Sequence, residues 1–234
     1  MRVITGEFRG RPLKAPKGDA TRPTTDRMKE SMMSSLESLV DSVEGARVLD
    51  AFAGSGALGL ELISRGALCA IFCERDRNAL NALQDNIATL KLSSRRALVK
   101  RGDVFKMPLG ALGPFNIVLL DPPYATDPQE IMSLLSRLND SGALASDCVV
   151  MYEHGSKDDR VEDAISTSIF TTLRSRSHGE TTVRFLGITD KTADMCESES
   201  CLDASVAVMA TEARLDASLS DMCATEDDID KKCV

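Results

Sequence analysis

The chain has 234 residues, of which 43% are hydrophobic, and a formal net charge of -8. This length allows one well-buried domain with additions, on a prior of about 100 to 200 residues per domain. No apolar run approaches the roughly 18 residues that a membrane-spanning helix needs, and no apolar signal-peptide region follows Met1, so the sequence predicts a soluble protein. Seven cysteines without a C-x-x-C pair favour reduced thiols, so we expect a soluble protein of the cytoplasm.

The negative charge is confined to one end of the chain. Residues 190–234 carry 12 acidic and 4 basic side chains, whereas the acidic and basic residues of the rest balance. The first 29 residues carry 8 basic and 3 acidic side chains, a net charge of +5. Clustered positive charge is the electrostatic signature of a phosphate-binding surface, so residues 1–20 are interpreted as a basic arm that contacts nucleic acid.

This basic arm is predicted to be a β-hairpin. Two short apolar segments, residues 3–5 and 12–14, flank a glycine-containing turn. Phe8 in that turn is a candidate for stacking on a base. The alternative is a solvated surface hairpin.

A helix is expected to follow the basic arm. Pro23 leads its entry, and Met28, Met32, Leu36 and Leu39 recur at helical spacing. One face of this helix should therefore pack on the domain, and its methionines are interpreted as core residues.

The stretch from Val48 to Gly59 predicts the first strand, a nucleotide-binding turn and a helix. The strand is expected over 47–50 and the helix over 57–64. Gly54 should permit the tight turn, Gly56 should leave room for a ligand at the backbone, and Gly59 should let helix and strand pack closely.

The remaining segments alternate between strand and helix patterns. Strands are predicted over 67–73, 97–100, 115–120 and 148–152, and helices over 77–92 and 129–138. This alternation predicts an α/β fold with a mostly parallel sheet. Strands over 168–175 and 181–187 would add an antiparallel edge and complete a seven-stranded mixed sheet.

Four carboxylates end the first four predicted strands: Asp50, Glu74, Asp103 and Asp121. Ligands of such sheets bind outside the carboxyl ends of the strands. Glu74 suits two ribose hydroxyls, Asp103 an adenine edge, and Asp50 a cationic amino-acid end. Together with the motif described next, they indicate S-adenosylmethionine as the cofactor.

The motif Asp121-Pro122-Pro123-Tyr124 is the more diagnostic one. Two prolines fix the backbone and remove two donors, so the carbonyls and the Asp121 carboxylate form a rigid set of acceptors for an exocyclic amino group. Tyr124 offers a face for stacking. An unstacked or flipped base is required to reach such a site, and catalysis would depend on orientation and electrostatics.

These motifs resemble the bacterial RsmD family of small-subunit rRNA guanine-N2 methyltransferases. The resemblance covers about residues 1–188 and rests on segments 2–6, 9–11, 22–27, 50–59 and 121–124. It implies a Rossmann-like class I S-adenosylmethionine-dependent fold and transfer of a methyl group to N2 of a guanine in 16S rRNA. The implied substrate is the small ribosomal subunit or its assembly intermediate, without a metal, and we expect a monomer.

The resemblance implies three groups of site residues. Asp121, Pro122, Pro123 and Tyr124 are expected to act at the target amine. The expected cofactor residues are Arg22, Thr24, Asp50, Phe52, Gly54, Ser55, Gly56, Glu74, Arg75, Asp103 and Val104. The expected RNA-binding residues are Arg2, Arg9, Arg11, Lys14 and Arg27.

Two features depart from the family pattern. The family usually places a Phe-Asn pair near positions 33 and 34, where this chain has Met33 and Ser34. Residues 189–234 form an acidic tail without a counterpart and with the composition of a disordered segment. The expected domains are thus the basic arm at 1–20, the methyltransferase domain at 21–188 and the acidic tail at 189–234.

Other functions stay open at this point. An N6-adenine or other exocyclic-amine methyltransferase acting on DNA or another RNA would use the same motif. A non-catalytic RNA-binding assembly factor would not need the intact glycines and Asp121. A nicotinamide-dependent oxidoreductase would fit the glycine pattern and leave Asp121 to Tyr124 unexplained. His154 and His178 have no evident partner that would make either a general base.

Overall fold

The computed structural model describes residues 1–16 and 26–189. Arg22, Thr24 and the acidic tail lie outside these residues, so the predictions made for them remain untested. Among the described helices, none has the length and apolar character needed to cross a membrane.

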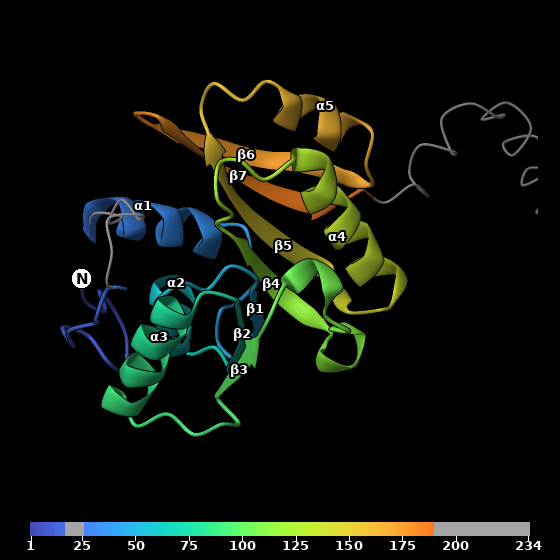
Figure 1. The fold of residues 1–234 in the computed structure, drawn as a ribbon. Coiled ribbons are helices and arrows are strands. Elements are labelled where there is room, and N and C mark those ends of the chain that lie inside the picture. The colour runs from blue at the N-terminus through green and yellow to red at the C-terminus, as the bar shows by residue number, and fades with distance from the viewer. Residues whose placement is uncertain (17–25, 190–234) are drawn as a thin grey trace, which may run out of the picture. The chain divides into compact units, whose positions relative to one another are not determined.

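The described chain forms three layers, with a seven-stranded sheet between two groups of helices (Figure 1). The strands are β1 Arg47–Asp50, β2 Cys69–Glu74, β3 Ala97–Arg101, β4 Phe115–Leu120, β5 Leu144–Gly155, β6 Phe170–His178 and β7 Thr181–Ile188. The helices are α1 Asp26–Glu37, α2 Ala57–Ser64, α3 Arg77–Thr89, α4 Pro128–Asp140 and α5 Arg160–Ser166. Two short 3-10 turns are η1 Val104–Lys106 and η2 Gly110–Leu112.

The sheet order is β3-β2-β1-β4-β5-β7-β6. The first five strands pair in parallel, while β7 is antiparallel to both β5 and β6. The predicted α/β class and the seven-stranded mixed sheet are confirmed. The order of the strands reverses at the β1–β4 pair: β2 and β3 extend from β1 to one side, and β5 extends from β4 to the other. Such a switch point is where doubly wound sheets bind their ligands.

The position of the antiparallel strand differs from the prediction. It was expected at the edge, but β7 lies between β5 and β6, and β6 forms the edge. The burial pattern supplies the reason: β7 is buried on both faces, whereas β6 alternates partly buried and exposed residues. A strand with one solvated face tolerates the edge, and a strand that is buried on both faces is favoured inside the sheet.

The two faces of the sheet support separate cores. One face packs against α4 and α5, with Ile131, Leu135 and Val161 fully buried. The opposite face packs against α1, α2 and α3, where Met33 and Leu62 are fully buried. The methionines of α1 are thus core residues, as predicted. Helix α5 was missed, because its apolar residues span only two turns.

The predicted N-terminal hairpin is not present. Residues 1–16 form turns with one isolated bridge, between Arg2 and Pro12. The amides of Ile4 and Thr5 donate instead to the side chain of Glu61 in α2, at 2.8 and 2.9 Å. Around the bridge, the two segments share the backbone hydrogen bonds Val3 N to Arg11 O, Gly10 N to Val3 O and Leu13 N to Met1 O, which do not extend into two paired strands.

Candidate active site

Asp50 and Asp121 flank the switch point of the sheet. Asp50 is the last residue of β1, and Asp121 follows the last residue of β4. Glu74 ends β2, and Asp103 lies two residues beyond β3. All four carboxylates therefore lie at the carboxyl edge of the sheet, each at the end of its own strand.

The glycine loop between β1 and α2 is built for close packing. A side chain at Gly59 would place its Cβ 2.5 Å from Phe72 and 2.9 Å from the Asp50 carboxylate, which confirms that this glycine brings helix and strand together. Gly54, at φ 54°, faces open space. Gly56, at φ 81°, faces the side chains of Leu83 and Leu60. The positive φ of Gly54 agrees with its expected role in the turn, but the unobstructed backbone is also at Gly54, whereas Gly56 makes room for Leu83 and Leu60.

The Glu74 carboxylate organises this loop. Its Oε2 accepts a hydrogen bond from Gly54 N at 2.8 Å, and its Oε1 accepts from the amides of Arg75 and Asp76, both at 2.7 Å. The Arg75 side chain is exposed. A carboxylate offers about four acceptor positions, so Glu74 retains capacity for one hydroxyl group.

Asp50 is enclosed below the loop, with 3% of its surface exposed. Burial raises the pKa of its carboxyl to about 7, against a lowering effect of the hydrogen bond from Gly59 N. The charges of Asp121 and Glu74 raise it further. A nearby cation would favour the ionised form of Asp50.

Two further cofactor candidates border the loop. The Asp103 side chain accepts a hydrogen bond from Phe105 N at 3.1 Å and caps η1, in which Val104 is buried. Phe52 and Phe105 meet edge to face, with ring centroids 5.8 Å apart. This aromatic contact thus connects Phe52, after β1, with the segment after β3 that contains Asp103 and Val104.

Ser55 is held from the neighbouring helix α3. The buried amide of Asn86 donates to Ser55 O at 2.9 Å and to Lys14 O at 3.0 Å, and its oxygen accepts from Lys14 N at 2.7 Å. Asn86 therefore fixes the N-terminal segment to the glycine loop. The sequence analysis missed this residue, because a single asparagine on a helix carries no distinguishing pattern.

The Asp121–Tyr124 segment follows β4, on the other side of the switch point from β1 and the glycine loop. Asp121 is exposed to solvent on one side, while the surrounding protein raises the pKa of its carboxyl to about 6. Pro122 is buried and Pro123 exposed. Tyr124 is 56% exposed, and its hydroxyl shares a hydrogen bond of 2.8 Å with Thr181 Oγ1. The phenol is thereby anchored to β7 while its ring stays accessible.

A depression of about 460 Å³ opens beside Tyr124. Its other lining residues come from the ends of β5 and β7 and the start of α5: Gly155, Ser156, Lys157, Asp158, Arg160 and Glu180. This is the concave surface that adjoins the Asp121–Tyr124 segment.

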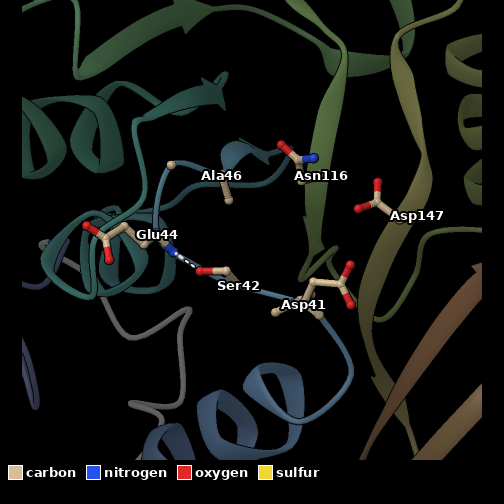
Figure 2. A pocket seen from close by; sticks show the side chains of 8 residues that line it. Asp41, Ser42, Glu44, Ala46, Asn116 and Asp147 are labelled. Carbon is tan, nitrogen blue, oxygen red and sulfur yellow. Dashed lines mark hydrogen bonds between the residues drawn. The ribbon is translucent and has the colours of Figure 1, made fainter.

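A second pocket, of about 260 Å³, lies at the amino ends of the strands, with Asn116 and Asp147 on its wall (Figure 2). It is thus at the opposite edge of the sheet from the carboxylates.

Glu153 is a second residue that sequence reasoning missed. It lies on β5 with 7% of its surface exposed, and its Oε2 has no hydrogen-bond partner in the described structure. Burial and the charge of Asp121 raise the pKa of its carboxyl to about 8. A lone glutamate between Tyr152 and His154 could have drawn attention as an acidic residue in an otherwise buried strand.

The five candidate RNA-binding residues, Arg2, Arg9, Arg11, Lys14 and Arg27, are all exposed. Arg2 pairs with Asp26 at 2.8 Å, and Lys14 pairs with Asp85 at 2.9 Å. Exposed pairs of this kind contribute little to stability and can be exchanged for phosphate contacts. The ring of Phe8 is covered on one side by the guanidinium of Arg96, 5.8 Å from its centroid.

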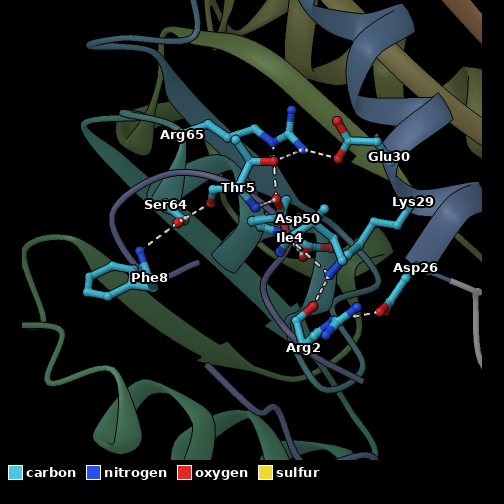
Figure 3. Close-up of polar contacts among 12 residues, drawn as sticks. Arg2, Ile4, Thr5, Phe8, Asp26, Lys29, Glu30, Asp50, Ser64 and Arg65 are labelled. Atoms are coloured by element: carbon cyan, nitrogen blue, oxygen red, sulfur yellow. Dashed lines mark hydrogen bonds and ion pairs between the residues drawn. The ribbon is translucent and has the colours of Figure 1, made fainter. Parts of the chain in front are cut away.

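A buried ion network anchors the N-terminal segment (Figure 3). Lys29 of α1 pairs with Glu61 of α2 at 3.1 Å and donates to Arg2 O at 2.5 Å. Arg65 pairs with Glu61 at 3.1 Å and also reaches Glu30 at 2.8 Å. Charges that looked like part of a nucleic-acid surface, Lys29 above all, therefore hold the segment in place.

His154 behaves as a structural residue. His154 is buried, its Nδ1 contacts Gly155 O at 2.9 Å and its Nε2 accepts from Arg184 at 3.2 Å. Burial lowers the pKa of His154 below its ordinary value. Within residues 1–16 and 26–189, no group of His, Cys, Asp and Glu side chains is arranged to hold a metal ion.

Comparisons with known proteins agree with this geometry. The family model described as "Conserved hypothetical protein 95" matches residues 1–187. The "Putative rRNA methyltransferase YlbH" of Bacillus subtilis strain 168 is 38% identical over 186 residues, which cover 78% of this chain and 96% of that protein. The "Ribosomal RNA small subunit methyltransferase D" of Escherichia coli K12 is 39% identical over 153 residues, 65% of this chain and 74% of that one.

A solved structure of a similar protein has the same fold. The "Putative methyltransferase yhhF" from Escherichia coli superimposes with a TM-score of 0.66 at 34% identity and covers 82% of this chain and 99% of that chain. With the motifs, the sheet order and a family match over residues 1–187 in agreement, the chain belongs to the RsmD-like family described as "Conserved hypothetical protein 95".

Proposed function

We propose that this protein transfers a methyl group from S-adenosylmethionine to the exocyclic N2 of a guanine in 16S rRNA of the small ribosomal subunit. The observation that carries the proposal is the Asp121–Tyr124 segment at the switch point, in a chain whose relatives include proteins named small-subunit rRNA methyltransferases.

The residues at the carboxyl edge suit the cofactor. Gly54 leaves open space above the loop, Glu74 keeps acceptor capacity, and Asp50 is a buried carboxyl whose ionisation a neighbouring ammonium would favour. Phe52, Ser55, Gly56, Arg75, Asp103 and Val104 complete the proposed set, together with Arg22 and Thr24, which lie outside the described residues. When bound, S-adenosylmethionine supplies an electrophilic methyl group on its sulfonium.

Asp121 and the prolines would orient the amine. The amino group of guanine is conjugated with its ring and is a weak nucleophile. Hydrogen bonds to Asp121 and to the carbonyls of the proline pair would turn its lone pair toward the methyl group. As the N–C bond forms and the C–S bond breaks, the nitrogen loses a proton, which the Asp121 carboxylate can accept and pass to water because it is exposed on one side.

Tyr124 would stack on the flipped base. Its ring is exposed, its hydroxyl is fixed to Thr181, and the depression beside it offers space for the nucleotide. The exposed residues Arg2, Arg9, Arg11, Lys14 and Arg27 would bind rRNA phosphates, so affinity should fall with added salt.

The test is methyl transfer from labelled S-adenosylmethionine to small ribosomal subunits isolated from a strain without the enzyme. Digestion and mass spectrometry identify the modified nucleoside, and DNA is offered in parallel. We expect N2-methylguanosine at one site. Another methylated base, or a preference for DNA, would contradict the substrate assignment, and no incorporation despite cofactor binding would contradict the activity.

A further inference from the structure

Glu153 is a buried carboxyl group that the proposed reaction does not yet use. It is 7% exposed, and its Oε2 has no hydrogen-bond partner among the described residues. Buried polar atoms are almost always satisfied, so one that is not, next to a ligand site, needs a physical reason.

The sheet register places Glu153 beside Asp121. Leu120 of β4 pairs with Tyr152 of β5, so the next residue of each chain segment is Asp121 and Glu153. Leu120 and Tyr152 both belong to the core on the α4 and α5 side. Because successive side chains alternate between faces, Asp121 and Glu153 fall on the other face, which α1, α2 and α3 cover.

Within residues 1–16 and 26–189, the surroundings of Glu153 provide no positive partner. Its antiparallel neighbour on β7 is Val183, and the basic residues His154 and Arg184 bond each other on the opposite face. Four charged residues of α1 form ion pairs elsewhere: Asp26 with Arg2, Lys29 with Glu61, and Glu30 and Glu37 with Arg65. Arg27 is exposed. Asp121 is thus the one charge that acts on the Glu153 carboxyl among the described residues, and Asp121 also raises the pKa of Asp50, as Glu74 does.

Two neighbouring carboxyl groups without a cation do not both ionise readily. Asp121 is open to water on one side, whereas Glu153 is enclosed, so the negative charge is better solvated on Asp121. The raised pKa of Glu153, about 8, and the lower one of Asp121, about 6, agree with this order.

We propose, building on the methyltransferase function above, that Glu153 is a positioning residue for Asp121: it retains the one proton of the pair and thereby keeps Asp121 ionised and oriented as the acceptor for the target amine. The proton released by the amine then goes to Asp121 and from there to water. Glu153 keeps its own proton throughout the reaction.

Two substitutions separate this role from simple packing. Glu153→Gln retains a hydrogen donor that does not titrate, and Glu153→Leu has similar volume but no donor. The control is Glu44→Gln, an exposed glutamate remote from the carboxyl edge. Turnover and the KM for the cofactor are measured from pH 5 to 9 with small ribosomal subunits as substrate.

The wild type should lose turnover below about pH 6, where Asp121 takes up a proton, and above about pH 8, where Glu153 loses its own. Glu153→Gln should keep neutral-pH turnover within about threefold and lose the alkaline decline. Glu153→Leu should lower turnover by about tenfold or more without changing the KM for the cofactor. An alkaline decline that persists in Glu153→Gln, or full turnover in Glu153→Leu, would overturn the proposal.

A second measurement does not depend on activity. In wild-type protein without substrate, the carboxyl carbon of Glu153, assigned by its loss in Glu153→Gln, should titrate near pH 8 by NMR. Removal of the neighbouring charge in Asp121→Asn should move this titration to lower pH. A Glu153 carboxyl that ionises near its ordinary value of 4.5 would overturn the pairing, even if the wild type methylated 16S rRNA. If Glu153 shows the expected titration but the protein transfers no methyl group, the proposed function is contradicted and the inference about Glu153 and Asp121 is not.

Discussion

Glu61 provides the sharpest test of how the N-terminal segment is held. This fully buried carboxylate accepts the amides of Ile4 and Thr5 and pairs with Lys29, which is itself 2% exposed. Glu61→Ala leaves the ammonium of Lys29 buried beside no carboxylate. Removing one partner of a buried ion pair costs about 3–5 kcal/mol, far more than an exposed pair would.

The measurement is urea unfolding at 25 °C, with thermal melting alongside. For a domain of this size, a loss of 3–5 kcal/mol lowers Tm by roughly 6–20 °C. The control Glu44→Ala removes an exposed glutamate and should change stability by less than about 0.5 kcal/mol. The double variant Lys29→Met, Glu61→Gln removes both charges at similar volume and should recover much of the loss.

Glu61→Ala should lower the affinity for rRNA more than the affinity for the cofactor. Residues 1–16 carry four of the five candidate RNA-binding residues, and Glu61 anchors them through two backbone hydrogen bonds. We therefore expect rRNA affinity to fall while cofactor affinity stays within about twofold, which is less than about 0.4 kcal/mol. A stability loss below about 1 kcal/mol, or unchanged rRNA affinity, would refute the anchoring role.

Three further predictions concern the carboxyl edge. Asp121→Ala should reduce methyl transfer by at least about a hundredfold while calorimetry shows cofactor affinity nearly unchanged; retained turnover would contradict its role at the amine. Glu74→Ala should weaken cofactor binding by about 10- to 100-fold, since a hydrogen bond to a charged group contributes about 1.5–3 kcal/mol, and equal affinity would argue against the ribose contact. Gly59→Ala places a methyl group 2.5 Å from Phe72 and should destabilise the fold by about 1–3 kcal/mol, whereas a neutral effect in urea unfolding would show that α2 can shift.

Local patterns predicted most of the elements but not their neighbours. The strand at 47–50, the helix at 57–64 and the strand at 115–120 were predicted with the observed bounds, because a short apolar run ended by a turn or a carboxylate is a local signal. The hairpin prediction was wrong, because the partner of the Ile4 and Thr5 amides is Glu61, more than fifty residues away. No spacing within residues 1–16 contains that information.

The glycine loop illustrates the same limit at a single residue. The sequence indicated that three glycines are needed between β1 and α2. Only the packing of α3 shows that Gly56 makes room for Leu83, and that the open backbone belongs to Gly54. The contact depends on a helix that begins 21 residues later.

By itself, the sequence determined the α/β class, the carboxylates that end the first four strands and the Asp121–Tyr124 segment, because each follows from a local pattern of residues close together in the chain. The tertiary structure alone decided the order of β7 and β6, the anchoring of the N-terminal segment and the placement of Glu153 on the strand next to Asp121. These features depend on which strands and helices become neighbours. Burial and strand register act between residues far apart in the chain, where a local pattern has no influence.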